Sequence, residues 1–194
     1  MPAEAALRAT TLARSGDLQV LMKGSLHTDE LMSAIVNKAT GLRGSTRISH
    51  VFLFDLPRYP KLLGLADCVV NIAPDLKTKR DILGNAVKLL QTLGISQPKV
   101  GIVAAVETVN PAIPATLDAQ ALVELARNGE WPGAVVHGPF GFDNAIPAEP
   151  ARTKKVDSPL PAAAAPPLTP RLTPTHMPTP RLHHTGREHR PRRP

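Results

Sequence analysis

Apolar residues in the first 150 positions form short continuous runs, separated by longer segments in which they recur with helical spacing. Near-continuous apolar runs bounded by turn residues are typical of strands covered on both faces. The runs predicted as strands are residues 18–22, 48–55, 68–72, 99–106 and 133–137. The predicted helices are residues 3–15, 28–39, 78–93, 116–128 and 148–155. Strands and helices that alternate with short connections predict an α/β fold with a largely parallel sheet.

Charge and composition divide the chain into two regions. Residues 1–150 hold equal numbers of basic and acidic residues, so the formal net charge of +7 lies entirely in residues 151–194. Every aromatic residue lies at or before Phe142, whereas nearly half of the 21 prolines follow position 150. We therefore predict that residues 1–158 belong to a folded domain and that residues 159–194 form a disordered tail rich in Pro, Arg and His.

Two explanations for the composition of this tail stay open. A shifted reading frame in a GC-rich coding region would give the same residues, and so would an evolved basic tail. Its arginines could contact nucleic-acid phosphates, but residues 159–194 offer no aromatic side chain for base stacking. Nucleic-acid binding is therefore not expected.

The compartment and the bound groups follow from further sequence features. A single cysteine, Cys68, excludes an intrachain disulfide and fits a reducing compartment. No signal peptide is evident at the N-terminus, and no apolar run approaches the ~20 residues that span a bilayer. We expect a cytoplasmic protein with no membrane partner. Disorder accounts for the tail histidines better than metal binding does, so no metal site is predicted.

The turn at residues 21–32 carries the clearest candidate chemistry. An apolar run stops at Lys23, Gly24 and Ser25, and helix-forming sequence resumes at Thr28, the predicted N-cap. Free backbone N–H groups at a helix start, a glycine, hydroxyls and a cation can together bind phosphate or an oxyanion. The lysine precedes the glycine, so this is not a Walker motif. An ordinary strand-to-helix turn with a good cap is the alternative.

Other polar residues also follow the predicted strands. In open α/β sheets, ligands bind beyond the carboxyl ends of the strands. The polar residues at these ends are Lys23, Ser25, His27, Thr28, Asn71, Glu107, Thr108, Asn110, His137, Asp143 and Asn144. Loops are polar in most proteins, so this pattern alone predicts an α/β enzyme of unknown substrate.

Seven short motifs in sequence order carry a family resemblance. They are Leu21-Met-Lys-Gly-Ser-Leu-His-Thr28, Arg47-Ile-Ser-His-Val-Phe52, Ala66-Asp-Cys-Val-Val-Asn-Ile-Ala-Pro74, Pro98-Lys-Val100, Ala105-Val-Glu-Thr-Val109, Ile113-Pro-Ala-Thr-Leu-Asp-Ala119 and Gly138-Pro-Phe-Gly-Phe-Asp-Asn-Ala-Ile146. With them, the chain resembles the phosphate acetyl/butyryltransferase family, most closely the transferase part of enoyl-CoA hydratase/phosphate acetyltransferase fusion proteins. The resemblance covers residues 5–158 and implies a domain truncated at both ends. It also implies an incomplete three-layer α/β/α fold with a mostly parallel sheet, similar to isocitrate and isopropylmalate dehydrogenases.

The resemblance implies reversible transfer of an acyl group, acetyl or butyryl, between coenzyme A and phosphate. Acyl-CoA, phosphate and acyl phosphate would be the partners of the chain, with coenzyme A as a substrate rather than a bound cofactor. In this chemistry a CoA thiolate attacks the carbonyl of an acyl phosphate and phosphate leaves. Such a site needs a base for the thiol, cations or N–H donors for phosphate, and donors for the developing oxyanion.

The resemblance also selects site residues. The predicted substrate- and phosphate-binding residues are Ser25, His27, Thr28, Arg47, Ser49, Asn71, Glu107, Asp143 and Asn144. A solvated arginine is the alternative for Arg47, and a helix cap is the alternative for Asp143. We interpret His50 and His137 as packed residues, and Cys68 as a small packed residue rather than a nucleophile.

No residue can be assigned as the principal catalytic group. Family members carry a Ser-Arg segment and then an aspartate further along, whereas this sequence continues with a Pro- and Ala-rich stretch from Ser158. We expect little or no turnover from the chain alone, because missing first-domain strands and last helices would leave apolar sheet edges uncovered. The alternative function is a non-catalytic fragment that acts at most as a binding or interaction module. Uncovered sheet edges would favour self-association into a homo-oligomer. A dehydrogenase relative is a weaker option, because no GxGxxG fingerprint is present.

Overall fold

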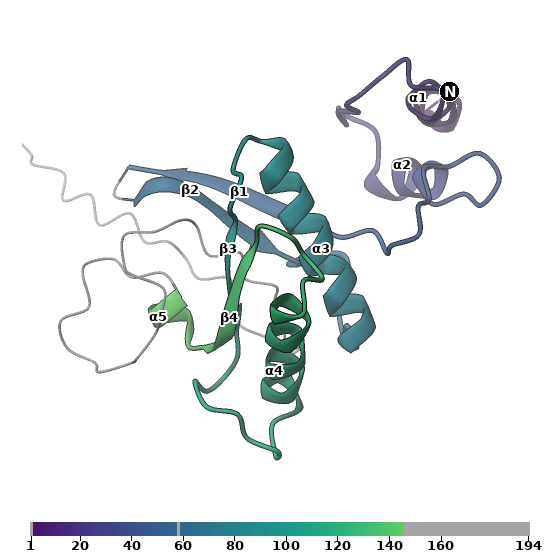
Figure 1. Ribbon diagram of the computed structural model, residues 1–194. Helices are drawn as coiled ribbons and strands as arrows, with labels where there is room; N and C mark the ends of the chain where they lie inside the picture. The colour runs from purple at the N-terminus through teal and green to yellow at the C-terminus, as the bar shows by residue number, and fades with distance from the viewer. Residues whose placement is uncertain (1, 58, 146–194) are drawn as a thin grey trace, which may run out of the picture.

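In the computed structural model of the chain, the described residues 2–57 and 59–145 form an α/β fold (Figure 1). Its elements are, in order, α1 (Pro2–Ser15), α2 (Thr28–Ile35), β1 (Val51–Leu56), β2 (Tyr59–Ala66), α3 (Leu76–Thr92), β3 (Lys99–Val103), α4 (Pro114–Arg127), β4 (Val135–Phe140) and α5 (Phe142–Ala145). The α/β class predicted from the apolar pattern is thus confirmed.

The helices α1 and α2 pack against each other and lie apart from the other elements (Figure 1). Ala6 and Thr10 are the buried residues of α1. The Arg14 guanidinium, near the end of α1, donates a hydrogen bond to the carbonyl oxygen of Ala39. Residues 36–50 contain no helix or strand, and they connect this helical pair to the rest of the fold.

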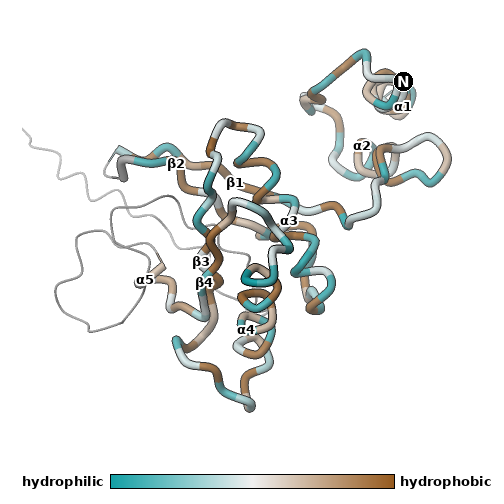
Figure 2. The backbone as a smooth tube through the Cα atoms, viewed as in Figure 1, coloured by the Kyte–Doolittle hydropathy of each residue, from teal (hydrophilic) through white to brown (hydrophobic). Residues whose placement is uncertain are grey.

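The main core lies among α3, α4 and the strands β3 and β4. Along α3, the residues Ile82, Leu83 and Leu90 are fully buried, at a spacing that places them on one helical face. Ile102 of β3 and Leu122 of α4 are fully buried too. Figure 2 shows the most apolar colour along β3 and β4. Burial of these side chains fixes α3, which carries much of the pocket described below.

The strands form two separate two-stranded sheets. Strands β1 and β2 pair antiparallel, with Val51 opposite Ala66, whereas β3 and β4 pair parallel, with Lys99 opposite Val135. The prediction of one largely parallel sheet is therefore wrong for the described residues. Only two residues separate β1 from β2, and so short a connection can join only antiparallel neighbours.

Several predicted elements need correction. Residues 18–22 form no strand, and Val20 and Met22 are 81% and 93% exposed. Residues 68–72 form a loop, because the strand ends at Ala66. The helix predicted over 28–39 ends at Ile35, and His27 rather than Thr28 is its N-cap.

The predicted helix 148–155 and the predicted tail 159–194 lie outside the described residues. Among the residues that the structure describes, no helix is both long and apolar enough to cross a membrane.

Candidate functional site

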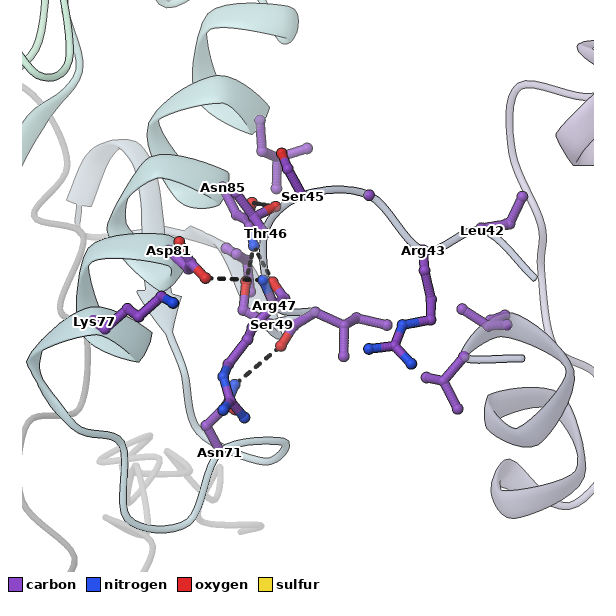
Figure 3. A pocket seen from close by; sticks show the side chains of 16 residues that line it. Leu42, Arg43, Ser45, Thr46, Arg47, Ser49, Asn71, Lys77, Asp81 and Asn85 are labelled. Atoms are coloured by element: carbon purple, nitrogen blue, oxygen red, sulfur yellow. Dashed lines mark hydrogen bonds between the residues drawn. The ribbon is translucent and has the colours of Figure 1, made fainter. Parts of the chain in front are cut away.

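A pocket of about 790 Å³ opens between the end of α2 and one face of α3 (Figure 3). Its apolar lining consists of Ile35, Val36, Leu42, Ile48, Val51 and Leu89. Its polar lining consists of Arg43, Ser45, Thr46, Arg47, Ser49, Asn71, Lys77, Asp81 and Asn85, and Gly44 completes it. The structure thus brings together three residues predicted from the sequence, Arg47, Ser49 and Asn71.

Side chains of α3 hold the segment that carries Arg47. The Asp81 carboxylate accepts the backbone N–H of Arg47 at 3.0 Å. Asn85 Nδ2 donates to the Arg47 carbonyl at 2.8 Å and to Ser49 Oγ at 2.9 Å, and Asn85 Oδ1 accepts from the Thr46 hydroxyl at 3.2 Å. The backbone of Arg47 is therefore anchored, while its guanidinium makes no hydrogen bond to another described residue and is available to a ligand.

Asn71 is positioned by a buried carboxylate. Asp67, only 3% exposed, accepts the N–H groups of Val69 and Val70, both at 2.9 Å. Its other oxygen accepts the backbone N–H of Asn71 at 3.2 Å and the Asn71 side chain at 2.7 Å. Asn71 Nδ2 also donates to the Ile48 carbonyl at 3.0 Å. Burial alone would raise the pKa of Asp67, but the hydrogen bonds that it accepts outweigh burial and hold this pKa below its ordinary value.

The charged side chains of the pocket are mostly cations. The cations are Arg43, Arg47 and Lys77, and the one carboxylate among the described lining residues belongs to Asp81, which already binds a backbone N–H group. Nearby, Asp75 caps α3 by accepting the N–H of Thr78 at 2.8 Å. Hydrogen bonds from Thr78 lower the pKa of Asp75, and the charges of Arg47 and Lys77 lower it further. The positive charge around the start of α3 suits an anionic ligand.

The predicted phosphate-binding turn lies outside this pocket lining. Ser25, His27 and Thr28 are exposed at the start of α2, where the Glu30 carboxylate accepts the His27 N–H at 3.3 Å. The Lys23 ammonium donates to the Leu26 carbonyl at 2.8 Å, so it folds back onto its own turn. Phosphate binding by this turn stays a prediction.

The remaining predicted residues follow the parallel strands. Glu107 is exposed in the loop after β3, and Asp143 and Asn144 belong to α5, which follows β4. Because β3 and β4 are parallel neighbours, both segments begin at the same edge of their sheet. Figure 1 shows α5 and α2 at opposite sides of the described fold. The roles of these residues stay predictions.

The two histidines interpreted as packed residues do lie in packed surroundings. The His50 ring meets the Phe52 ring edge-on, with centroids 4.2 Å apart. His137 is half-buried on β4, and burial lowers its pKa, with a further contribution from the positive charge of Arg127. Cys68 is also partly buried. Within the described ranges, no group of three or more His, Cys, Asp and Glu side chains could hold a metal ion.

Sequence reasoning missed six polar pocket residues: Arg43, Ser45, Thr46, Lys77, Asp81 and Asn85. Lys77, Asp81 and Asn85 recur every four residues along α3, so this spacing places them on one face of the helix. This polar face, opposite the apolar face of the same helix, could therefore have been used to predict pocket residues from the sequence. Arg43 lies in a segment without regular structure, and nothing in its sequence context marks it.

Comparisons with known proteins agree with one another. The family model described as phosphate acetyl/butaryl transferase matches residues 1–173. The phosphate acetyltransferase of Rhizobium meliloti is 49% identical over 156 residues, which are 80% of this chain and 49% of that protein. The phosphate butyryltransferase of Clostridium acetobutylicum is 40% identical over 153 residues, 79% of this chain and 51% of that protein. The chain spans about half the length of the curated relatives that it matches.

A solved structure extends the similarity to three dimensions. The crystal structure of a branched-chain phosphotransacylase from Enterococcus faecalis V583 superposes with a TM-score of 0.75 at 30% sequence identity. The superposition covers 88% of this chain and 60% of that chain. The EutD phosphotransacetylase from Staphylococcus aureus shares the fold, with a TM-score of 0.65.

Proposed function

Because this chain belongs to the phosphate acetyl/butyryl transferase family, we propose that it takes part in acyl transfer between coenzyme A and phosphate. The transferred group would be acetyl or butyryl, as in the named activities of its relatives. Acyl-CoA, phosphate and acyl phosphate would be its partners.

The observation that carries this proposal within the structure is the cationic pocket beside α3. Both substrates of the reaction carry phosphate groups, which arginine and lysine bind through charge-assisted hydrogen bonds. Arg47 offers a guanidinium on an anchored stretch of backbone, and Ser49 and Asn71 supply polar groups to the same lining. The pocket therefore has the chemistry needed to bind and orient a phosphate-bearing substrate.

The chemical step needs more than this pocket. When the CoA thiolate attacks the acyl carbonyl, the thiol must lose a proton and the developing oxyanion must be stabilised. Among the residues that the structure describes, the pocket lining contains no imidazole and no thiol, and its single carboxylate is already hydrogen-bonded. We keep Ser25, His27, Thr28, Glu107, Asp143 and Asn144 as proposed acyl-phosphate ligands, and we assign the base to no residue.

The family membership also supports the finer architectural proposals. We propose that residues 1–158 are part of a three-layer α/β/α domain similar to isocitrate and isopropylmalate dehydrogenases. We further propose that residues 159–194 are a disordered tail. We also propose that the protein forms a homo-oligomer and is located in the cytoplasm.

Two measurements on the purified chain test the proposed function. Isothermal titration calorimetry with coenzyme A and with acetyl phosphate measures binding, and thioester formation from the two substrates measures transfer. We expect Arg47→Gln to weaken binding of a phosphate-bearing substrate by roughly tenfold, the loss of about one charge-assisted hydrogen bond. Lys88→Gln removes the same charge from an exposed position of α3 outside the pocket and serves as the control.

The outcomes separate the two candidate functions. Binding together with thioester formation supports a transferase. Binding without any thioester supports the second candidate, a non-catalytic binding module. If neither coenzyme A nor acetyl phosphate binds, the proposed function is wrong.

A further inference from the structure

We propose that residues 17–23 are a dimerisation segment, in which two copies of this chain pair as antiparallel strands around a two-fold axis at Val20. The inference goes beyond the acyl-transfer function and specifies how the proposed homo-oligomer forms. It rests on the exposure of the segment, on its unpaired backbone, and on a match between its two halves.

The apolar side chains of this segment lie in solvent. Leu18, Val20 and Met22 are 38%, 81% and 93% exposed, and Figure 2 shows apolar colour along this connection between α1 and α2. Their spacing of two residues places all three on one face of an extended strand. Such a face is removed from water only when another surface covers it. No described residue covers Val20 or Met22 in this way.

The backbone of the segment is also unpaired. Among the described residues, none forms a hydrogen bond with a backbone N–H or C=O group of residues 19–23. This stretch contains no proline, so each of its residues has a donor and an acceptor. A row of unpaired backbone groups that carries apolar side chains is a template for pairing with a strand of another chain.

The two halves of the segment match each other when two copies run antiparallel with Val20 opposite Val20. In that register Leu18 of one copy lies opposite Met22 of the other, so apolar side chains meet on one face. Asp17 of one copy lies opposite Lys23 of the other, which places opposite charges together at both ends of the pairing. A shift of the register by one residue separates these charges. Parallel pairing in register would instead place like charges opposite each other, which is unfavourable.

Both charged side chains are available for these pairs. They are exposed, and neither forms an ion pair with another described residue. Asp17 accepts the Ser15 hydroxyl at 2.6 Å, and the Lys23 ammonium donates to the carbonyls of Leu26 at 2.8 Å and Gly24 at 3.3 Å. These partners are neutral, so a group of opposite charge is the stronger partner for each. Because the paired segment is short, we expect a weak dimer that depends on concentration.

Sedimentation velocity of the full chain over a range of concentrations tests this inference. We expect the wild-type chain to change from monomer to dimer as its concentration rises. Val20→Asp should raise the dissociation constant roughly tenfold or more, because two carboxylates then face each other across the axis. Val69→Asp is the matched control, since Val69 is 61% exposed in the loop after β2. It should leave the dissociation constant unchanged.

Exchange of the two charges tests the register. Asp17→Lys alone places lysines opposite lysines, and Lys23→Asp alone places aspartates opposite aspartates. Each variant should therefore dimerise roughly tenfold more weakly than the wild type. A mixture of the two variants should form a heterodimer, because each aspartate then faces a lysine. The double variant, Asp17→Lys with Lys23→Asp, should recover the wild-type dissociation constant.

Each contrary outcome overturns the inference. A wild-type chain that stays monomeric at every concentration has no such interface, and a dimer that Val20→Asp leaves intact uses a different surface. A mixture of the charge variants that forms no dimer shows that the strands do not pair in this register. Assemblies larger than a dimer contradict a two-fold pairing, which closes on itself. If Val20→Asp loses its circular dichroism signal, the charge variants decide by the same criteria. Binding of coenzyme A and acetyl phosphate is measured separately, so these results leave the proposed function untouched.

Discussion

Replacing Asp67 by asparagine tests how the loop between β2 and α3 is held against the pocket. One oxygen of this buried carboxylate accepts two backbone N–H groups, and the other accepts two N–H groups of Asn71. The single amide oxygen of asparagine can still accept the N–H groups of Val69 and Val70, but the NH₂ group then faces the two N–H donors of Asn71, which lose their acceptor. Each buried donor left unpaired costs about 1–3 kcal/mol. We therefore expect Asp67→Asn to lower the free energy of unfolding by roughly 3 kcal/mol.

The pH dependence of this effect has a defined sign. The pKa of Asp67 in the folded chain lies below its ordinary value of 3.8, because the hydrogen bonds that the carboxylate accepts outweigh its burial. Its ionised form thus contributes stability that is fully present above about pH 4 and is lost as pH falls through the folded-state pKa. The asparagine side chain of the variant cannot titrate. The stability difference between the two proteins should be largest near neutral pH and should shrink on acidification.

Urea unfolding followed by the fluorescence of Trp131 measures this difference. Trp131 is the only tryptophan of the chain and is 8% exposed in the main core. Asp55→Asn is the matched control, because Asp55 lies exposed on β1, and we expect a change of less than about 0.5 kcal/mol. A stability of Asp67→Asn within about 0.5 kcal/mol of the wild type, or a difference that stays constant down to acidic pH, would refute the reasoning.

The predicted helices within the described residues and three of the predicted strands match the structure, whereas the runs at 18–22 and 68–72 form no strand and β2 was not predicted. Helix α3 begins two residues before its predicted start, and α4 does too, because a helical apolar face is a local property of the chain. A strand exists only where another strand pairs with it. Residues 18–22 have a strand-like apolar run but no partner in the described fold, so they form none. The segment of β2 contains an early proline, which argues against a strand, yet β1 pairs with it.

Sequence reasoning predicted pocket residues only next to the two strands that follow each other in the chain and pair, β1 and β2. Arg47 and Ser49 precede β1, and Asn71 follows β2, so pairing of these two antiparallel strands brings the three residues to one end of the hairpin. Nothing local in the sequence places α2 relative to α5. The sequence predicted one sheet, whereas the described residues form two, so the strand order alone could not show which of the more distant predicted residues share a site.

Two further substitutions test the packing that supports the pocket. Gly138→Ala should cost about 1–3 kcal/mol in a thermal or urea melt, because its Cβ would lie 2.8 Å from both Cβ and the carbonyl oxygen of Ile102 on the neighbouring strand. Gly24→Ala, whose Cβ would have no atom within 4 Å, should change stability little and is its control. Lys79→Met removes one partner of the ion pair with Asp118 that joins α3 to α4, and Lys79 is only 4% exposed. The Asp118 side chain is 25% exposed, so water can solvate part of the carboxylate charge that Lys79 no longer pairs. We therefore expect the free energy of unfolding to fall by about 2 kcal/mol, less than the roughly 3–5 kcal/mol lost when a fully buried pair is broken. Adding Asp118→Leu should recover most of that loss, because no unpaired charge then remains between the helices. A double variant less stable than Lys79→Met would show instead that Asp118 stabilises α4 without Lys79.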